Sequence, residues 1–234
     1  MEELSRTEML LGKENVELLR SKKVIVFGVG GVGGYVCEAL ARSGVGRIDI
    51  VDNDTVSLSN INRQIIALHS TVGRYKTEVM RERMLDINPS LCVNAHNTFY
   101  TPDTADLFDL SEYDYIVDAI DTVSGKIELA VRADKSSTPI ISSMGAGNKL
   151  DPTAFKVSDI YKTSVCPLAR VMRTELKKRG IPSLKVVYSE EKAKQPIIPD
   201  EMKILPKIPP ASCAFIPSVV GLIVASEVIK DLIK

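Results

Sequence analysis

A glycine-rich turn between a buried strand and a helix constrains the fold of this chain more than any other feature. The run 24–27 (VIVF) is apolar and β-branched, which is typical of a buried parallel strand. Gly28, Gly30 and Gly33 follow it in the pattern G-x-G-x-x-G, and residues 35–43 then carry apolar side chains at helical spacing. This order brings free backbone amides and a helix N-terminus to one point, where phosphate binds. We therefore predict a nucleotide-binding fold.

A second strand is expected at 47–51, and it ends at Asp52, 24 positions after Gly28. A carboxylate in this place accepts hydrogen bonds from ribose hydroxyl groups, and Asp54 flanks the same place. Apolar strands and helical segments then alternate through residue 150. This alternation predicts an α/β fold with a doubly wound, mostly parallel, Rossmann-like sheet that is extended by a mixed C-terminal part.

The expected elements follow from the periodicity of apolar residues and from the turn-forming residues between them. Helices are expected at 1–23, 61–68, 76–87, 101–108, 124–135, 167–179 and 217–233. Further strands are expected at 91–98, 113–120, 139–143, 156–161 and 185–188, with a loop at 190–210. The chain is expected to have an N-terminal helical segment (1–23), a nucleotide-binding core (24–150) and a C-terminal extension with a basic segment and an apolar closing helix (151–234).

The composition is that of an ordinary globular protein without a global electrostatic signal. The 234 residues are 44% hydrophobic and 26% charged with zero formal net charge, so binding of nucleic acid requires a local basic patch. The four cysteines form no C-x-x-C pair, which argues against a zinc ribbon and a disulfide framework. The apolar run 214–225 is too short to span a membrane. We expect a cytoplasmic protein without membrane contact.

A dense group of polar side chains follows Asp52 and favours cleavage of ATP over binding of a dinucleotide. Its members are Ser59, Asn60, Asn62, Arg63, Gln64 and Lys76. A dehydrogenase does not break the pyrophosphate of its cofactor and has no use for such a group. When an α-phosphate is attacked, fixed cations stabilise the charge that builds up on the leaving pyrophosphate. Arg63 and Lys76 are therefore candidate catalytic residues, although each alone also fits a solvated helix face.

Asp121 is the candidate metal ligand. It follows the strand expected at 113–120, at the sheet edge where ligands of open α/β folds bind. Mg²⁺ usually takes one or two carboxylates together with substrate phosphates. Asp118 competes for this role, but strand alternation places it on one face of the sheet, whereas Asp121 lies beyond the strand. Capping of the following helix is the alternative role for either residue.

These motifs, in this order and spacing across residues 1–150, resemble the ATP-binding set of the ubiquitin-activating-like (ThiF/MoeB-type) adenylyltransferase superfamily. The resemblance implies ATP contacts from Gly28, Gly30, Gly31, Gly33, Asp52, Asp54, Ser59, Asn60, Arg63, Gln64, Lys76 and Asp121. It also implies Mg²⁺ at Asp121, and a further nucleotide contact from Thr122, which stands where many relatives have Asn. Arg6 resembles an N-terminal arginine that reaches the ATP of the partner subunit, which implies a catalytic Arg6 and a homodimer with shared sites.

The C-terminal half resembles one branch of this superfamily, the tRNA threonylcarbamoyladenosine dehydratases. The matching segments are Gly145-Ala146-Gly147, Asp151-Pro152, Lys162-Thr163 and Pro167-Leu168. The resemblance implies an ATP-dependent adenylyltransferase and cyclase, which adenylates the carboxylate of threonylcarbamoyladenosine in tRNA and cyclises it with net loss of water. Because the cyclisation is intramolecular, proximity supplies much of its rate and no enzyme nucleophile is required.

A local basic segment provides candidate contacts for tRNA. Between Lys156 and Lys185 the chain has eight basic and two acidic residues, a net charge of +6, which is typical of a surface that binds a phosphate backbone. The candidates are Lys162, Arg170, Arg173, Lys177, Lys178 and Arg179. A solvated helix face is the alternative explanation for this segment.

Three alternatives to tRNA modification stay open. Activation of a ubiquitin-like sulfur carrier is disfavoured by the missing C-x-x-C pairs, and a dehydrogenase gives Arg63, Gln64 and Lys76 no role. A nucleotide-bound adaptor for a cysteine desulfurase is the third, and docking of such a partner also remains open as an added role. Cys166 lies where ubiquitin-type relatives keep a thioester cysteine, but a helix-start residue without a catalytic role is the more frequent case.

Overall fold

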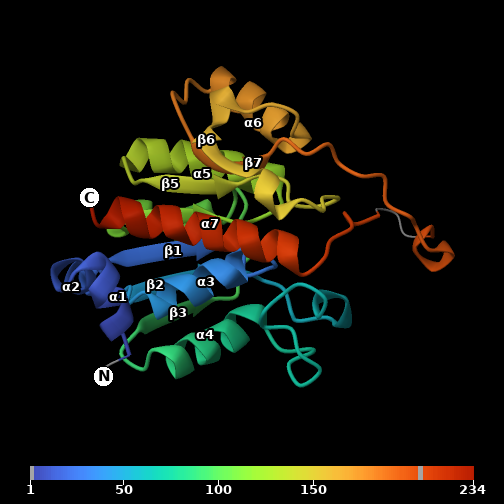
Figure 1. Cartoon of the computed structure of the whole chain (residues 1–234). Helices are drawn as coiled ribbons and strands as arrows, with labels where there is room; N and C mark the ends of the chain where they lie inside the picture. The colour runs from blue at the N-terminus through green and yellow to red at the C-terminus, as the bar shows by residue number, and fades with distance from the viewer. Residues whose placement is uncertain (1–2, 205–207) are drawn as a thin grey trace.

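A seven-stranded sheet forms the centre of the molecule (Figure 1). The computed structural model describes residues 3–204 and 208–234; residues 1–2 of the predicted N-terminal helix and 205–207 of the predicted loop 190–210 lie outside the described residues. The strands are β1 (Lys23–Phe27), β2 (Arg47–Val51), β3 (Cys92–His96), β4 (Tyr115–Asp118), β5 (Ile140–Ser143), β6 (Phe155–Asp159) and β7 (Lys185–Ser189). They are ordered β3-β2-β1-β4-β5-β7-β6, and β6 alone among these seven runs antiparallel to its neighbour. The predicted α/β fold, mostly parallel with a mixed C-terminal part, is confirmed.

Helices cover both faces of this sheet. They are α1 (Ser5–Leu11), α2 (Lys13–Ser21), α3 (Gly33–Arg42), α4 (Lys76–Ile87), α5 (Val123–Ser136), α6 (Pro167–Lys178) and α7 (Phe215–Leu232). Alternate residues of β1 point to opposite faces: Val24 and Val26 pack in a core with α3, α4 and α7, whereas Ile25 and Phe27 pack in another with α5. A third core lies between α5, α6 and β7. No helix of the described part of the chain is long and apolar enough to cross a bilayer.

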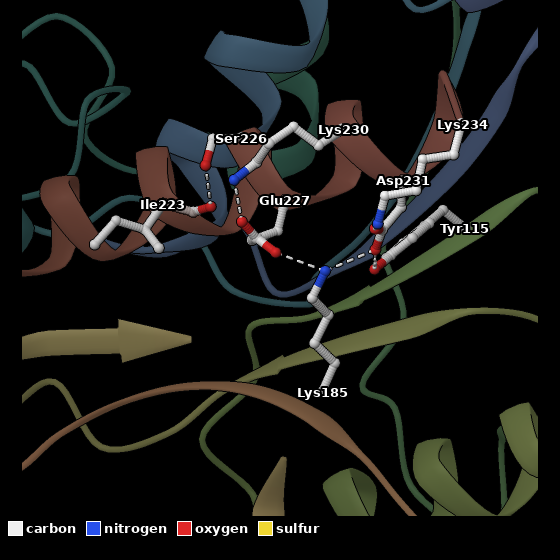
Figure 2. A network of polar contacts seen from close by, with 8 residues as sticks. All are labelled: Tyr115, Lys185, Ile223, Ser226, Glu227, Lys230, Asp231 and Lys234. Carbon is white, nitrogen blue, oxygen red and sulfur yellow. Dashed lines mark hydrogen bonds and ion pairs between the residues drawn. The ribbon is translucent and has the colours of Figure 1, made fainter. Parts of the chain in front are cut away.

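The closing helix α7 is part of the core. It lies along α3 (Figure 1), and a Cβ on Gly221 would come within 2.4 Å of the Val32 carbonyl oxygen, so this close approach requires glycine. At its C-terminal end, α7 is joined to the start of β7 by Lys185, whose ammonium lies 2.6 Å from Glu227 and 2.8 Å from Asp231 (Figure 2). The helix thus ties the C-terminal strands to the nucleotide-binding half of the sheet.

Three of the helix predictions are wrong. The segment 1–23 has a break at Gly12 (φ +87°), so it forms α1 and α2 rather than one helix. In place of a helix at 61–68 there is a 3₁₀ turn at Leu58–Asn60 followed by irregular turns, and 101–108 keeps only a 3₁₀ turn at Ala105–Leu107.

Local side-chain hydrogen bonds explain the two lost helices. The Thr71 hydroxyl donates to the Ile66 carbonyl and accepts from the Leu68 amide. The Thr104 hydroxyl donates to the Phe99 carbonyl and accepts from the Thr101 amide. Such bonds offer the backbone an alternative to the helical pattern, because threonine competes for the same donors and acceptors.

Candidate nucleotide-binding site

The candidate site lies at the carboxyl ends of β1 and β4. Strand β1 is flanked by β2, which follows it in the chain, on one side and by β4 on the other. The order of connections therefore reverses at β1, and in open α/β sheets this reversal opens a crevice that binds ligands. The loops that end β1, β2 and β4 all reach this crevice.

The glycine turn fits tightly against the end of β4. Gly28 has φ +89°, and a Cβ there would lie 2.7 Å from the Ala119 carbonyl oxygen. A Cβ on Gly33, the first residue of α3, would lie 1.7 Å from the Gly28 carbonyl oxygen. Both positions require glycine, since no other residue fits these contacts. The turn therefore delivers the chain directly from β1 into the N-terminus of α3, where backbone amides and the helix dipole favour an anion.

Asp52 connects the glycine turn to the end of β2. One of its carboxylate oxygens accepts the Val29 amide at 2.7 Å, and the other accepts the Asp54 amide at 2.9 Å. A carboxylate has about four acceptor positions, so these two bonds leave capacity for ribose hydroxyl groups. Backbone amides of the glycine turn and of the loop after β2 thus hold Asp52, the residue predicted to bind ribose, in place.

Lys76 and Asp54 form an ion pair at the start of α4. The Lys76 ammonium lies 2.6 Å from an Asp54 oxygen; the side chain of Lys76 is 7% exposed, and that of Asp54 is 61% exposed. A cation in the first turn of a helix lies at the positive end of the helix dipole. This unfavourable position is understandable if the ammonium serves an anionic ligand.

The turn 57–64 carries the remaining predicted ATP contacts. Arg63 donates to the Ser59 carbonyl at 2.8 Å, and its Cγ lies 3.6 Å from where a Cβ of Gly31 would be. Asn60 is buried, and its Oδ1 accepts the Ser57 amide at 3.1 Å. The side chain of Asn60 therefore shapes the turn, and Arg63 lies beside the glycine turn.

Gln64 has an unsatisfied atom at the glycine turn. Its Nε2 lies 3.9 Å from where a Cβ of Gly30 would be. Its Oε1 is buried without a hydrogen-bond partner, as is the Tyr100 hydroxyl elsewhere in the described residues. An unpaired buried acceptor costs about 1–3 kcal/mol. A ligand that donates a hydrogen bond at the glycine turn would remove this cost.

Asp118 and Asp121 occupy different environments, as their positions in the sequence predict. Asp118 is fully buried; it pairs with Lys126 at 2.9 Å and accepts the Ser142 hydroxyl. Asp121 is exposed in the loop that follows, and Thr122 is the N-cap position of α5 without a side-chain capping bond. Within residues 3–204 and 208–234, no group of three His, Cys, Asp or Glu side chains is placed to hold a metal ion. A single carboxylate is compatible with Mg²⁺ only where substrate phosphates supply further ligands.

Arg6 lies at the end of the sheet where the parallel strands begin, whereas the residues described above lie where these strands end. The Leu4 side chain, next to α1, lies 2.7 Å from where a Cβ of Gly44 would be, and Gly44 lies three positions before the first residue of β2. Figure 1 shows α1 and α2 at the end of the sheet where β1 begins. Arg6 therefore does not join the nucleotide site of its own chain.

The predicted tRNA contacts separate along α6. Cys166, the N-cap residue of α6, lies 3.9 Å from where a Cβ of Gly145 would be, which places this end of the helix beside the carboxyl end of β5. The helix has 12 residues and is therefore about 18 Å long. Arg170 lies in its first turn, whereas Lys177, Lys178 and Arg179 lie at the far end.

Contacts of the basic side chains differ as well. Lys178 and Arg179 form ion pairs with Glu175 at 2.7 and 2.6 Å, and Arg173 donates to the Thr163 carbonyl at 3.0 Å. Arg170 and Lys162 are exposed. Cys166 itself is buried and is a free thiol.

Several residues that border the site were missed by sequence reasoning. Pro217, at the start of α7, lies 3.1 Å from where a Cβ of Gly31 would be. Asn62 belongs to the polar group expected after Asp52, but its hydrogen bond to the Ser212 carbonyl at 3.0 Å is not indicated by the sequence. Asn148 exchanges hydrogen bonds with Ala211 and accepts from the Lys194 amide, so it holds both ends of the segment after β7. These contacts join residues that are far apart in the chain, so the sequence does not indicate them. The pair of Lys126 with Asp118 differs, because these two residues are only eight positions apart in the sequence.

Comparisons with known proteins agree with this geometry. A model of the ThiF family matches residues 4–234. The chain belongs to the ThiF family. The superfamily predicted from the glycine turn and the polar group after Asp52 is thereby confirmed.

Two ThiF-type relatives and one solved structure illustrate the similarity. The chain is 47% identical to tRNA threonylcarbamoyladenosine dehydratase of Bacillus subtilis (strain 168), over all of this chain and 96% of that protein. It is 32% identical to molybdopterin-synthase adenylyltransferase of Escherichia coli (strain K12), over 68% of each. The crystal structure of E. coli tRNA N6-threonylcarbamoyladenosine dehydratase, TcdA, in complex with ATP matches with a TM-score of 0.89 and 33% identity, covering 98% of this chain and 93% of that one.

Proposed function

We propose that this protein is an ATP-dependent enzyme that adenylates the carboxylate of threonylcarbamoyladenosine in tRNA and cyclises it with net loss of water. The observation that carries the proposal is the match, over the whole chain, to the B. subtilis dehydratase at 47% identity. The glycine turn, Asp52 and the Arg63 and Lys76 cations support it, since they form a site for a nucleotide whose phosphates are to be cleaved.

The chemistry divides into two steps. A carboxylate oxygen of the substrate attacks the α-phosphorus of ATP; the new P–O bond forms as the bond to pyrophosphate breaks. An N–H or O–H group of the same threonylcarbamoyl substituent then attacks the activated acyl carbon and releases its proton, and the bond from that carbon to the AMP oxygen breaks, so that AMP leaves with the carboxylate oxygen. The lost water is accounted for in this way, because its oxygen departs on AMP.

The residues of the site have distinct proposed roles. The amides of the turn from Gly28 to Gly33 hold phosphate oxygens, and the Asp52 carboxylate accepts the ribose hydroxyl groups. Arg63 and Lys76 stabilise the negative charge that develops on the phosphates. Asp121 would hold Mg²⁺ together with phosphate oxygens, and the ion would add positive charge at the same place.

A homodimer remains part of the proposal. Arg6 lies at the sheet edge away from its own nucleotide site, so it could act only in the site of a second copy of the chain. A cytoplasmic location and docking of a cysteine desulfurase are predictions that rest on the sequence alone.

We propose that tRNA binds where the parallel strands end, which we call the carboxyl edge of the sheet. The modified adenosine must reach the α-phosphate there, so cations near this edge are best placed to contact the flanking RNA phosphates. Arg170 in the first turn of α6 meets this condition, as does exposed Lys194, whose amide donates to Asn148 beside the site. The cluster from Lys177 to Arg179 follows Arg170 by seven to nine residues, and is therefore about 10–14 Å farther along the helix.

A single incubation tests the proposed function. The protein is mixed with ATP, Mg²⁺ and tRNA that carries threonylcarbamoyladenosine; the tRNA is then digested and its nucleosides are weighed by mass spectrometry. We expect a loss of one water from the modified nucleoside and release of AMP and pyrophosphate. An unchanged nucleoside, with AMP formed only when a ubiquitin-like carrier protein is added, would refute the proposal and favour sulfur-carrier activation.

A further inference from the structure

A fully buried ion pair lies directly beneath the nucleotide site and has no part in the chemistry described above. Asp118, the last residue of β4, and Lys126, in the first turns of α5, are both 0% exposed, and their charged atoms are 2.9 Å apart. Removing two charges from water costs several kcal/mol for each ion, and apolar replacements of buried pairs are often as stable as the pair. Stability alone is therefore a poor explanation for this pair.

The pair also holds the loop that leads to Asp121. The Lys126 ammonium donates a second hydrogen bond to the Ile120 carbonyl at 3.0 Å. One Asp118 oxygen accepts the Ile120 amide at 3.3 Å, and the other accepts the Ser142 hydroxyl of β5 at 2.5 Å. Both polar backbone groups of Ile120 are thus bonded to the ion pair.

This loop touches the nucleotide site on both sides of Ile120. The preceding residue, Ala119, packs against the glycine turn, since its carbonyl oxygen lies 2.7 Å from where a Cβ of Gly28 would be. The following residue is Asp121. The peptide bond between Ile120 and Asp121 contains the Ile120 carbonyl, which accepts the hydrogen bond from Lys126. The orientation of this one peptide therefore fixes where the Asp121 backbone lies relative to the glycine turn.

We infer that Lys126 is a positioning residue for the adenylation step. It acts through the Ile120 carbonyl and keeps Asp121 in register with the phosphates that the glycine turn binds. Asp118 holds the buried ammonium in place at 2.9 Å, and Ser142 orients Asp118 from the neighbouring strand. The inference rests on the proposed function for its kinetic consequence, but its structural consequence does not depend on that function.

The test replaces the pair by apolar residues of similar volume, so that no charge is left buried alone. The variant is Asp118→Leu with Lys126→Met and Ser142→Ala, and its thermal unfolding shows whether the fold is kept. The matched control is Lys135→Met, which removes an exposed lysine from the same helix. Both proteins are assayed with ATP and threonylcarbamoyl-modified tRNA, and both are crystallised.

We expect the apolar variant to fold and to lose about 100-fold in kcat, the effect of displacing a reacting group by about 1 Å. The KM for ATP should change by less than about threefold, because a group that acts in the transition state lowers kcat rather than ground-state binding. The control should match the wild type. In the crystal structure of the apolar variant, the Ile120–Asp121 peptide should have moved relative to Gly28.

Two results separate the inference from the proposed function. An apolar variant with the wild-type Ile120–Asp121 peptide, or with the wild-type kcat, overturns the positioning role. A wild-type protein that does not dehydrate the modified nucleoside overturns the proposed function instead, and the crystal structures then decide the positioning role by themselves. If the apolar variant fails to fold, the single variant Lys126→Arg is measured instead. A loss of about 100-fold in kcat without any displacement of the Ile120–Asp121 peptide in this variant would contradict the inference.

Discussion

The ammonium group of Lys76 lies 2.6 Å from the carboxylate of Asp54, and the lysine is buried although the aspartate is open to solvent. The pair joins the first turn of α4 to the loop after β2, at the edge of the sheet where the glycine turn ends. The protein shields the Lys76 ammonium from water, whereas the Asp54 carboxylate that it faces remains in contact with water. Phosphate oxygens that arrive from the crevice would therefore meet a cation that is already fixed in place.

Replacement of Lys76 by Met should remove this fixed cation and leave the hydrocarbon part of the side chain. We expect kcat/KM for the dehydration to fall by about 10²–10³-fold, as for other preorganised groups that stabilise transition-state charge. Steady-state release of AMP measures the effect. The matched control is Arg81→Met, an exposed cation on the same helix, and an equal loss in both variants would contradict a specific role of Lys76.

Replacement of Gln64 tests whether its unpaired buried oxygen accepts a hydrogen bond from bound ATP. Gln64→Met should leave the stability of the free protein unchanged or raise it by about 1 kcal/mol, because the orphaned acceptor disappears. The rise in Tm produced by a fixed excess of ATP should shrink, since a ligand stabilises the folded state by an amount that grows with the logarithm of its affinity. Thermal unfolding with and without ATP measures both quantities. A full ATP-induced rise in the variant would show that the amide does not contact the nucleotide.

The sequence predicts the parts of this fold that depend on local order. The apolar run before Gly28, the glycine spacing and Asp52 identify the first βαβ unit, because the residues that bind phosphate and pack β1 against α3 are close together in the chain. The helix expected at 76–87 matches α4, whose first residue is Lys76. Asp121 is likewise found beyond the end of β4, with Asp118 buried in the strand.

The sequence does not predict contacts that join distant segments. Pro217 against Gly31 and Asn148 between the two ends of the segment after β7 depend on how the completed sheet brings strands together. The basic residues of α6 look like one patch in the sequence, but Lys178 and Arg179 are both paired with Glu175, and the length of the helix separates them from Arg170. Periodicity records which face a residue occupies and not which end of the sheet it reaches.

The buried hydroxyl of Tyr100 predicts a stabilising substitution. Tyr100 is 3% exposed and packs against Phe27, with ring centroids 4.6 Å apart, and its hydroxyl has no partner. Burial raises the pKa of this phenol. Tyr100→Phe should therefore increase the free energy of unfolding by about 1 kcal/mol, because the cost of burying an unpaired hydroxyl is removed. Urea unfolding followed by circular dichroism measures the change.

Tyr113 supplies the matched control for that prediction. Its hydroxyl donates to the buried Asp49 carboxylate at 2.8 Å. Tyr113→Phe should lower the free energy of unfolding by about 1–3 kcal/mol, since a hydrogen bond to a charged acceptor is lost. If both variants were destabilised alike, the Tyr100 hydroxyl would have to be paired in solution.

The network at the end of α7 predicts how stability responds to acid (Figure 2). Partial burial opposes ionisation of Asp231, but hydrogen bonds from Lys185, Lys234 and Tyr115 outweigh it and lower the pKa of Asp231 to about 2. A carboxyl whose folded pKa lies below its unfolded value of about 3.9 stabilises the fold above that value and loses this contribution as the pH falls to about 2. The contribution of Asp231 is about 2 kcal/mol at neutral pH.

Asp231→Asn should therefore lower stability at pH 7 and have little effect at pH 2. The difference in unfolding free energy between wild type and variant should shrink between about pH 4 and about pH 2. Urea unfolding at a series of pH values measures it. A difference that stays constant over this range would mean that Asp231 titrates alike in the folded and unfolded chains.

The division of α6 predicts which cations meet RNA. Arg170 is exposed beside the carboxyl edge of the sheet, whereas Lys178 and Arg179 are paired with Glu175 at the other end. Each phosphate contact releases counterions, so loss of one contact lowers the slope of log K against log salt by about 0.7–0.9. Arg170→Gln should produce a reduction of this size in binding of threonylcarbamoyl-modified tRNA, measured by fluorescence anisotropy at several KCl concentrations.

The double variant Lys178→Gln with Arg179→Gln is the comparison that locates the RNA. It removes two positive charges, twice as many as Arg170→Gln, and a tRNA attracted only by overall charge would respond more strongly to it. A tRNA bound across the carboxyl edge should respond less, because the two side chains point to Glu175 and lie about 18 Å along the helix from the site. A larger loss of salt dependence in the double variant would place the RNA at the opposite end of α6, away from the glycine turn, and would contradict binding across the carboxyl edge.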